Sequence, residues 1–337
     1  MSHVEYVYSS EKNFFSIPAP IPEVLAKDEV LVKVSAVGIC GSDLYHHKTY
    51  RGDELRLGHE WIGSVVKKGA LVTHLEIGDM VTSSSTLGCG ECLYCLKTEV
   101  NMCENPIHLC SEKMGALRSY LQISSFNAIK LNSKNPSDVL LEVMAVAEEA
   151  MALLAANKLD QPKKALVLGA GTVGILCAHL LKEKGIEVSI TDIQVSRVKR
   201  SIEIGLKGYP LNFLMMDKSA HNQFDVIIDA TSDRESNVSG WSLLPIFGTK
   251  NMTAIMVGKY IAPVEIKPDM LAKLASRLVF MRGVPLNTLE MTVKKWSGQM
   301  DFLASKLITH HFDAEKLSDG FEVASNTQVS GKVVITL

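Results

Sequence analysis

Four cysteines stand within fifteen residues of this chain, at positions 89, 92, 95 and 103. Their spacing, C-x2-C-x2-C-x7-C, is typical of four thiolates that surround a single metal ion. Zn²⁺ prefers such a tetrahedral thiolate cage, with Zn–S distances of about 2.3 Å. Gly88 and Gly90 let the backbone turn tightly around the ion. The sequence therefore predicts a structural zinc lobe over residues 88–104, with Cys89, Cys92, Cys95 and Cys103 as ligands.

Two other interpretations of the cluster exist, a pair of disulfides and an iron–sulfur cluster. The chain begins Met-Ser-His-Val-Glu without an apolar signal segment, which predicts a cytoplasmic location. Thiols stay reduced there, so disulfides are disfavoured. Zinc is the preferred interpretation.

Size and composition indicate a globular protein with a small-molecule partner. The 337 residues suffice for two domains, and apolar residues make up 47% of the chain. No apolar run approaches the roughly 18 residues of a membrane span, so we expect no membrane association. The net charge of −2 gives no electrostatic reason to expect a nucleic acid partner.

Two kinds of sequence follow one another. Up to about Ile129, short β-type runs are broken by glycine turns, whereas after about Leu140 strands alternate with helical segments. The second pattern predicts a parallel sheet, and the final stretch looks β-type again. We therefore predict an α/β fold in which a doubly wound Rossmann domain, 149–284, is inserted into a β-rich domain made of 1–148 and 285–337.

A glycine-rich motif marks the dinucleotide site. The segment Gly169-Ala-Gly171-Thr172-Val173-Gly174 directly follows a predicted strand and opens a predicted helix. Gly169 permits the tight turn, Gly171 lets the pyrophosphate approach, and Gly174 allows close helix–strand packing. We expect the segment, including Thr172 and Val173, to hold the phosphates of the cofactor at the helix N-terminus.

Asp192 ends the second predicted strand, eighteen residues beyond Gly174. A carboxylate there can accept hydrogen bonds from the adenosine ribose. It would repel a 2′-phosphate, which favours NAD over NADP. Arg197, with Lys199 and Arg200, could instead bind a phosphate at the cofactor site, although a solvated helix face is the other interpretation.

Two short motifs carry the candidate reactive residues. Gly38-Ile-Cys40-Gly-Ser42-Asp43 is expected in a turn after a strand, and Gly58-His59-Glu60 in another turn nineteen residues later. A single cysteine is most often an inert core residue, and a single histidine most often satisfies a local hydrogen bond. The two motifs gain meaning from their order along the chain together with the cysteine cluster and the glycine-rich segment.

With these four motifs the chain resembles, over essentially its full length, the zinc-containing medium-chain dehydrogenase/reductase family, which includes alcohol, polyol and threonine dehydrogenases. The resemblance implies a GroES-like β-rich catalytic domain and two zinc ions, one structural and one catalytic. Cys40 and His59 match ligands of the catalytic zinc. The third ligand matches Glu148, with Glu149 as the alternative.

The resemblance also implies roles for residues around that ion. Asp43 would orient His59 by accepting its free N–H, and Glu60 would lie behind the ligands or exchange with one of them. Zinc would lower the pKa of the substrate hydroxyl, so that hydride can pass to nicotinamide. Ser42 matches the hydroxyl that receives the proton. The backbone of Val284 corresponds to a strand end beside nicotinamide in relatives.

The outer proton path departs from the family. Many relatives carry histidine five residues after the ligand cysteine, where this chain has Tyr45. His46 could replace that histidine, or ribose hydroxyls and water could pass the proton. The other interpretation is that His46 and its neighbour His47 are surface residues.

The resemblance implies NAD-dependent oxidation of a secondary alcohol, a polyol, sugar or cyclitol, to a ketone. Three alternatives remain. The first is an amino-alcohol dehydrogenase of the L-threonine type, the second an inactive NAD-binding redox sensor or scaffold, and the third the metal-free quinone-reductase branch, which normally lacks the cysteine cage. Homodimers and homotetramers are common in the family.

Overall fold

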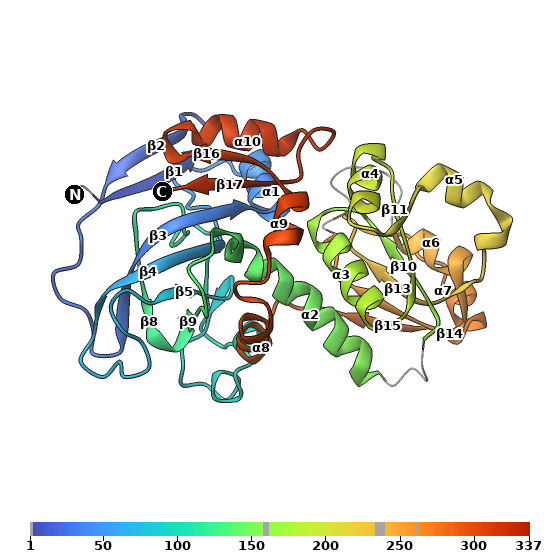
Figure 1. Cartoon of the computed structure of the whole chain (residues 1–337), viewed down its shortest axis with the longest axis horizontal. Coiled ribbons are helices and arrows are strands. Elements are labelled where there is room, and N and C mark those ends of the chain that lie inside the picture. Colours follow the sequence, from blue (N-terminus) through green and yellow to red (C-terminus); the bar gives the residue numbers. More distant parts are fainter. Residues whose placement is uncertain (1–2, 158–161, 233–239, 261) are drawn as a thin grey trace. The chain divides into compact units, whose positions relative to one another are not determined.

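The computed structural model describes residues 3–157, 162–232, 240–260 and 262–337 (Figure 1). The chain divides into two compact units. The β-rich unit comprises Met1–Ala145, Gly283–Asn326 and Ser330–Leu337, and the dinucleotide-type unit comprises Val146–Arg282 and Thr327–Val329. The boundaries expected at 148/149 and 284/285 lie close to these.

The β-rich unit is built on a seven-stranded sheet. Its order is β16-β17-β3-β4-β5-β9, and β8 also pairs with β3. The long strand β3 is buried along most of its length, so it forms the centre of the unit. The strands are β3 (Glu29–Ile39), β4 (Glu60–Lys68), β5 (Met80–Thr82), β8 (Tyr120–Ser124), β9 (Ile129–Lys130), β16 (Ile308–Asp313) and β17 (Lys332–Thr336).

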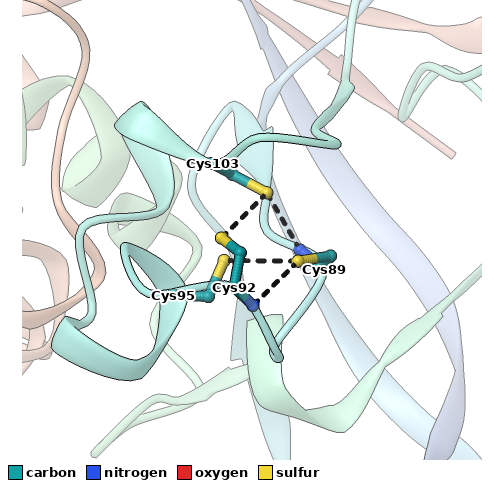
Figure 2. Close-up of side chains that lie close together, drawn as sticks. All are labelled: Cys89, Cys92, Cys95 and Cys103. Atoms are coloured by element: carbon teal, nitrogen blue, oxygen red, sulfur yellow. Dashed lines mark hydrogen bonds between the residues drawn. The ribbon is translucent and has the colours of Figure 1, made fainter.

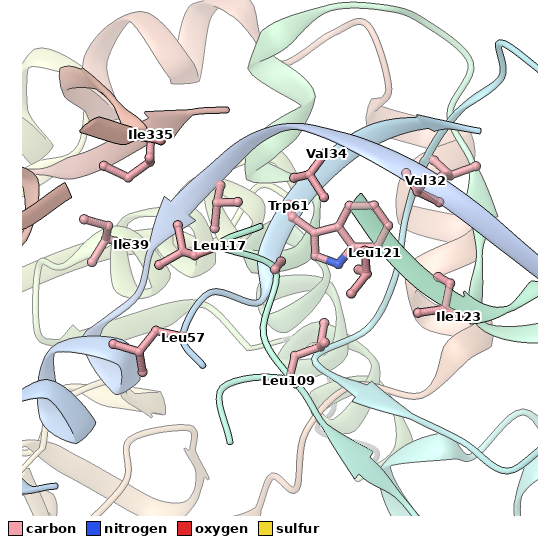
Figure 3. Packing of buried hydrophobic residues seen from close by; sticks show 14 of the residues in the cluster. Val32, Val34, Ile39, Leu57, Trp61, Leu109, Leu117, Leu121, Ile123 and Ile335 are labelled. Atoms are coloured by element: carbon pink, nitrogen blue, oxygen red, sulfur yellow. The ribbon is translucent and has the colours of Figure 1, made fainter. Parts of the chain in front are cut away.

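The core of the β-rich unit packs around Trp61 (Figure 3). The indole is fully buried, and its Nε1–H donates to Oγ of Ser83 over 3.1 Å. Val34 and Leu121 are buried in the same cluster. This packing holds β4 rigidly, and β4 begins immediately after His59.

The strand β17 lies between β16 and β3 and so joins β16 to the rest of the sheet. β17 pairs in parallel with β16 and antiparallel with β3, where Val333 lies opposite Ile39 and Val334 opposite Gly38. Residues nearly three hundred positions apart thus become neighbours. This pairing brings Lys332 to the end of β3 that precedes Cys40.

Smaller elements complete the β-rich unit. Two hairpin-like pairs are β1 (Val4–Ser9) with β2 (Asn13–Pro18) and β6 (Thr86–Leu87) with β7 (Ile107–His108). Its helices are α1 (Gly41–Thr49), α8 (Leu286–Trp296), α9 (Asp301–Leu307) and α10 (Leu317–Ser325), and its 3-10 turns are η1 (Cys95–Lys97), η2 (Val100–Met102), η3 (Ser125–Asn127), η4 (Pro136–Leu140) and η6 (Ala314–Lys316). The helix α2 (Leu141–Ala156) leads from this unit into the next.

The dinucleotide-type unit contains a six-stranded parallel sheet, ordered β12-β11-β10-β13-β14-β15. The chain starts at β10, runs outward to β12, and then crosses to β13 on the other side, which is the doubly wound order with its switch point beside β10. The predicted α/β fold class is therefore confirmed. The strands are β10 (Lys164–Leu168), β11 (Glu187–Asp192), β12 (Lys207–Pro210), β13 (Phe224–Asp229), β14 (Gly248–Met256) and β15 (Arg277–Phe280).

The central strands of this sheet are apolar and buried. β10 and β13 carry runs of Val, Ile and Leu with almost no exposure, as central strands covered on both faces do. Among the described residues, no helix has both the length and the apolar character needed to cross a bilayer. The helical elements of the unit are α3 (Thr172–Glu183), α4 (Val195–Glu203), α5 (Leu211–Met216), η5 (Lys218–Ala220), α6 (Gly240–Phe247) and α7 (Pro268–Lys273).

Candidate active site and metal centres

The four clustered cysteines converge on one point (Figure 2). Their sulfur atoms all lie within 4.8 Å of one another. The Sγ atoms of Cys89 and Cys95 are 3.9 Å apart, and those of Cys92 and Cys103 are 4.0 Å apart. A tetrahedron with Zn–S bonds of about 2.3 Å has sulfur–sulfur edges of about 3.8 Å, so this donor set fits one zinc ion.

The same distances argue against disulfides, because bonded sulfurs lie about 2.05 Å apart. All four cysteines are free thiols. Backbone N–H groups support the cage, since Cys92 N–H points to Sγ of Cys89 over 3.4 Å and Cys89 N–H to Sγ of Cys103 over 3.3 Å. The backbone thus contributes to holding the four sulfur atoms in place.

The backbone before the first cysteine is clamped by Asn127. Its side chain accepts from Gly88 N–H over 2.8 Å and donates to Gly88 C=O over 3.0 Å. A Cβ atom at Gly88 would lie 2.7 Å from Sγ of Cys95. Only glycine fits there, which is the physical reason for glycine beside the first ligand.

Cys40 lies where β3 ends and α1 begins. The segment around it was predicted to be a turn, but the helix α1 starts at Gly41, and Cys40 is its N-cap. The Oδ2 atom of Asp43 accepts from Cys40 N–H over 2.8 Å. Asp43 therefore caps the helix and holds the backbone of Cys40 in place.

Asp43 also faces His59. Its Oδ1 atom accepts from Gly58 N–H over 2.9 Å and lies 3.4 Å from Nδ1 of His59. Burial alone would raise the pKa of Asp43, but His59 and the N–H groups of Cys40 and Gly58 lower it to about 2. Burial alone would lower the pKa of His59, whereas the charges of Asp43 and Cys40 raise it well above 6.5. The negative charge of Asp43 thus stabilises a positive charge at His59.

Three candidate ligand atoms meet at this place. Those of Cys40, His59 and Glu60 lie within 4.8 Å of one another. Thiolate, imidazole and carboxylate are the donors that catalytic zinc sites use, so the residues fit such an ion. Glu60 is also paired with the buried Lys332, whose Nζ donates to Oε1 of Glu60 over 2.8 Å.

Glu142 also lies near His59 and Glu60. The motifs of the sequence did not predict it as a site residue. It is 5% exposed, hydrogen-bonds Ser85, and interacts electrostatically with His59 and Glu60. Burial raises its pKa. The signal that could have found it is a carboxylate in the otherwise apolar run Val139-Leu-Leu-Glu-Val-Met144, where a charged residue needs a partner.

Glu148, the predicted third ligand, lies six residues further along α2. Six residues correspond to about 9 Å of helix rise and about one and two-thirds turns, so the two side chains leave the helix on different faces. Glu148 belongs to the dinucleotide-type unit, whereas His59 and Glu142 belong to the β-rich unit. Its metal role, and that of the alternative Glu149, stay predictions.

The candidate proton path begins beside His59. The hydroxyl of Ser42 lies 3.4 Å from Nε2 of His59. His46 follows one turn later on α1, so it lies on the same face as Ser42. His47 instead packs in a ring cluster with Tyr8, Phe14 and Phe321, which accounts for it structurally.

Cys110 lies beside this centre. Its sulfur lies within 4.8 Å of ligand atoms of Asp43 and His59. Its φ angle of 69° is unusual for a residue with a side chain. Burial raises the pKa of Cys110 to about 12, so this thiol stays protonated.

In the dinucleotide-type unit, the glycine-rich segment has the geometry its sequence predicts. Gly169 has a φ angle of +94°, and a Cβ atom at Gly174 would lie 1.8 Å from the carbonyl oxygen of Gly169. α3 begins at Thr172, so its N-terminus follows the turn directly. Val173 lies in the same first turn.

Asp192 ends β11 next to that turn. Its Oδ2 atom accepts from Ala170 N–H over 2.7 Å and its Oδ1 from Gln194 N–H over 2.8 Å. Nη1 of Arg197 lies 3.7 Å from Asp192 Oδ2. Val284 belongs to the β-rich unit, where its carbonyl accepts from the hydroxyl of Ser84 over 3.4 Å; its contact with nicotinamide stays a prediction.

A doubly wound sheet with a dinucleotide fingerprint, a four-thiolate cage and a Cys–His–carboxylate centre together define a zinc-dependent dehydrogenase that uses a nicotinamide dinucleotide.

Comparison with known proteins agrees with this class. Residues 26–133 match the family model of the alcohol dehydrogenase GroES-like domain. L-threonine 3-dehydrogenase of Shigella dysenteriae is 28% identical over 349 aligned positions, which cover 97% of each chain. The resemblance of the chain to the zinc-containing medium-chain dehydrogenase/reductase family, expected from its four motifs, is thereby confirmed.

Solved structures share the whole fold. Galactitol-1-phosphate dehydrogenase from Escherichia coli superposes with a TM-score of 0.85 at 19% identity, covering 99% of this chain and 100% of the other. An alcohol dehydrogenase from E. coli CFT073, complexed with NADH, superposes with a TM-score of 0.85 at 22% identity, covering all of both chains. The predicted GroES-like domain is thereby confirmed.

Proposed function

We propose that the protein oxidises a secondary alcohol of a polyol, sugar or cyclitol to a ketone, using NAD and a zinc ion at Cys40 and His59. The observation that carries this proposal is a carboxylate-rich centre. Both Glu60 and Glu142 lie beside His59, whereas the other cysteine near His59, Cys110, groups with Asp43 and His59 rather than with Cys40.

We propose Glu142 rather than Glu148 as the third zinc ligand. Glu142 is buried next to His59, and a buried carboxylate is stabilised by binding a cation. Since Glu148 lies about 9 Å further along the same helix, one ion cannot bind both residues unless α2 unwinds. Glu60 is already neutralised by Lys332, which favours a supporting role for it.

Zinc in this site would supply a Lewis acid that lowers the pKa of a substrate hydroxyl. Asp43 holds the His59 ring so that Nε2 is available to the ion. Ser42 is placed to take the substrate proton, because its hydroxyl lies next to His59 Nε2. His46, one turn along α1, offers the next step toward solvent.

NAD is the proposed cofactor because Asp192 is buried at the end of β11 with its carboxylate fixed by two N–H groups. A 2′-phosphate would have to approach this negative charge. Arg197 beside it offsets part of that repulsion. We therefore expect a preference for NAD rather than complete exclusion of NADP.

A second candidate substrate is L-threonine. It is favoured by the L-threonine 3-dehydrogenase of S. dysenteriae, which aligns along 97% of both chains. A dimer or tetramer remains the expected assembly, and the cytoplasm the expected location. An inactive NAD-binding sensor is disfavoured because Cys40, Ser42 and His59 are all in place.

The test combines metal analysis with a substrate panel. The purified protein is expected to contain two zinc ions per chain and to reduce NAD with polyols, sugars or cyclitols faster than with L-threonine. Reduced nicotinamide is followed by its near-ultraviolet absorbance. Faster turnover of L-threonine would select the amino-alcohol alternative, and one zinc without turnover would select the inactive binder.

A further inference from the structure

The hydroxyl of Tyr260 joins three segments of the dinucleotide-type unit. It donates to Oδ2 of Asp229 over 2.9 Å and accepts from Gly240 N–H over 3.0 Å. The hydroxyl of Thr231 lies in close contact with it. Thus one hydroxyl connects the end of β13, the start of α6 and the loop after β14.

Asp229 is the centre of this network. The side chain is fully buried, and Oδ1 accepts from both the N–H of Thr231, over 3.0 Å, and its hydroxyl, over 2.5 Å. Burial raises the pKa of Asp229. A buried carboxylate is costly unless its partners satisfy it, so an apolar side chain would serve better if packing were its only role.

The backbones at this point are in direct contact. Val257 N–H and Gly258 N–H both donate to the carbonyl of Asp229, over 2.9 and 2.8 Å. A Cβ atom at Gly258 would lie 1.8 Å from the carbonyl oxygen of Thr231. The residues directly after β13 and β14 are therefore fixed to each other, and Tyr260 links them through its side chain.

The network lies at the carboxyl edge of the sheet, where dinucleotides bind in doubly wound folds. A Cβ atom at Gly169 would lie 3.2 Å from Cγ2 of Thr231, so the network adjoins the glycine-rich turn. Asp192 lies on the β11 side of the switch point, the side that we propose for the adenosine half. The two halves of a dinucleotide bind on opposite sides of the switch point, so we expect the nicotinamide half on the side of β13 and β14.

We infer that Tyr260, with Asp229 and Thr231, is a positioning residue for the nicotinamide half of the dinucleotide. The inference rests on the proposed function. Tyr260 acts by holding the ends of β13 and β14 in one arrangement, so the bound half meets a preformed surface and loses less free energy to ordering the loops.

The experiment uses the full chain and two ligands. NAD carries both halves, whereas ADP lacks nicotinamide and its ribose. Tyr260→Phe should weaken NAD binding about fivefold to tenfold, the effect of one net hydrogen bond. ADP binding should change less than about twofold. Calorimetry or ligand-induced changes in tryptophan fluorescence gives both affinities.

Matched variants separate positioning from folding. Tyr209→Phe removes a hydroxyl from the same unit outside the network and should leave NAD binding unchanged. Thr231→Ser keeps the hydroxyl and should retain NAD affinity, whereas Thr231→Val should lose it as Tyr260→Phe does. The threonine pair decides the question even if Tyr260→Phe fails to fold.

Two outcomes would overturn the inference. The first is NAD affinity in Tyr260→Phe equal to that of the unaltered protein. The second is an equal loss for NAD and ADP together with a lower unfolding temperature, which would indicate a purely structural network. A wild-type protein that binds no NAD would instead remove the proposed function itself, and this control is measured first.

Discussion

The ammonium group of Lys332 donates to Oε1 of Glu60 over 2.8 Å, and both side chains are almost fully buried. β3 lies between the strands that carry them. The pair can meet because Gly38 of β3 has no side chain, since a Cβ atom there would lie 2.7 Å from Oε2 of Glu60. Lys332 also donates to the carbonyl of Ile39 over 3.1 Å, next to Cys40.

Lys332→Met should therefore destabilise the protein by about 3 kcal/mol, because it leaves a buried carboxylate without its cation. Denaturant unfolding measures the loss. Adding Glu60→Gln should restore much of the stability, because the uncompensated charge is then gone. A double variant as unstable as Lys332→Met would contradict the pairing.

Zinc affinity at the Cys40–His59 centre should fall as the pH falls. The pKa of His59 is raised in the metal-free protein, so below that pKa a proton must leave before the ion binds. In Asp43→Asn the pKa of His59 should move down toward its usual value. The variant should bind zinc about tenfold more weakly at alkaline pH, where orientation of the ring matters.

The difference in zinc affinity between the unaltered protein and Asp43→Asn should become smaller toward acidic pH. The reason is that protons begin to compete with zinc at a lower pH in the variant. Competition with a fluorescent zinc chelator over a pH series gives both profiles. Parallel profiles would show that Asp43 does not set the protonation of His59.

Glu142→Gln should lose catalytic zinc and turnover, while Glu148→Gln should keep both. The two substitutions are chemically identical and lie on one helix, so each controls for the other. Metal content by mass spectrometry and steady-state rates are the measurements. The reverse pattern would restore Glu148 as the ligand.

Asn127→Ala should destabilise the zinc lobe without altering the chemistry. It removes two hydrogen bonds to Gly88 and leaves buried backbone groups unpaired, a loss of about 1–3 kcal/mol. The unfolding midpoint should fall and zinc should leave the cage more readily on chelation, with kcat nearly unchanged. An equal drop in kcat would show that the lobe does more than stabilise.

Asp192→Ser should reduce the preference for NAD over NADP. It removes the charge that a 2′-phosphate would meet, while the guanidinium of Arg197 stays beside the site. The ratio of kcat/KM for the two cofactors is the measurement. An unchanged ratio would mean that other residues select the cofactor.

Features fixed by local spacing could be predicted from the sequence. The four cysteines lie close together in the chain, so their spacing alone indicates the cage. The segment 169–174 adjoins a strand and a helix that its neighbours determine, and α3 begins at Thr172 as expected. The doubly wound sheet was predictable because alternating strands and helices leave few topologies.

Features that depend on distant pairing could not be predicted in the same way. Lys332 reaches Glu60 only because β17 pairs with β3, a register that no local pattern shows. The acidic pair at 148 and 149 matches the family pattern, whereas Glu142 stands in an apolar run without a motif beside it. Within a helix, however, the face on which a carboxylate lies decides its contacts, and a shift of six residues changes that face.

Because β17 inserts between β16 and β3, the reactive centre depends on the C-terminal strand as much as on the segments that contain its ligands. A chain growing on the ribosome can complete its cysteine cage once Asn127 has emerged. It cannot neutralise Glu60 until synthesis has passed Lys332. Incomplete products would thus resemble a metal-binding protein long before they could act on a substrate.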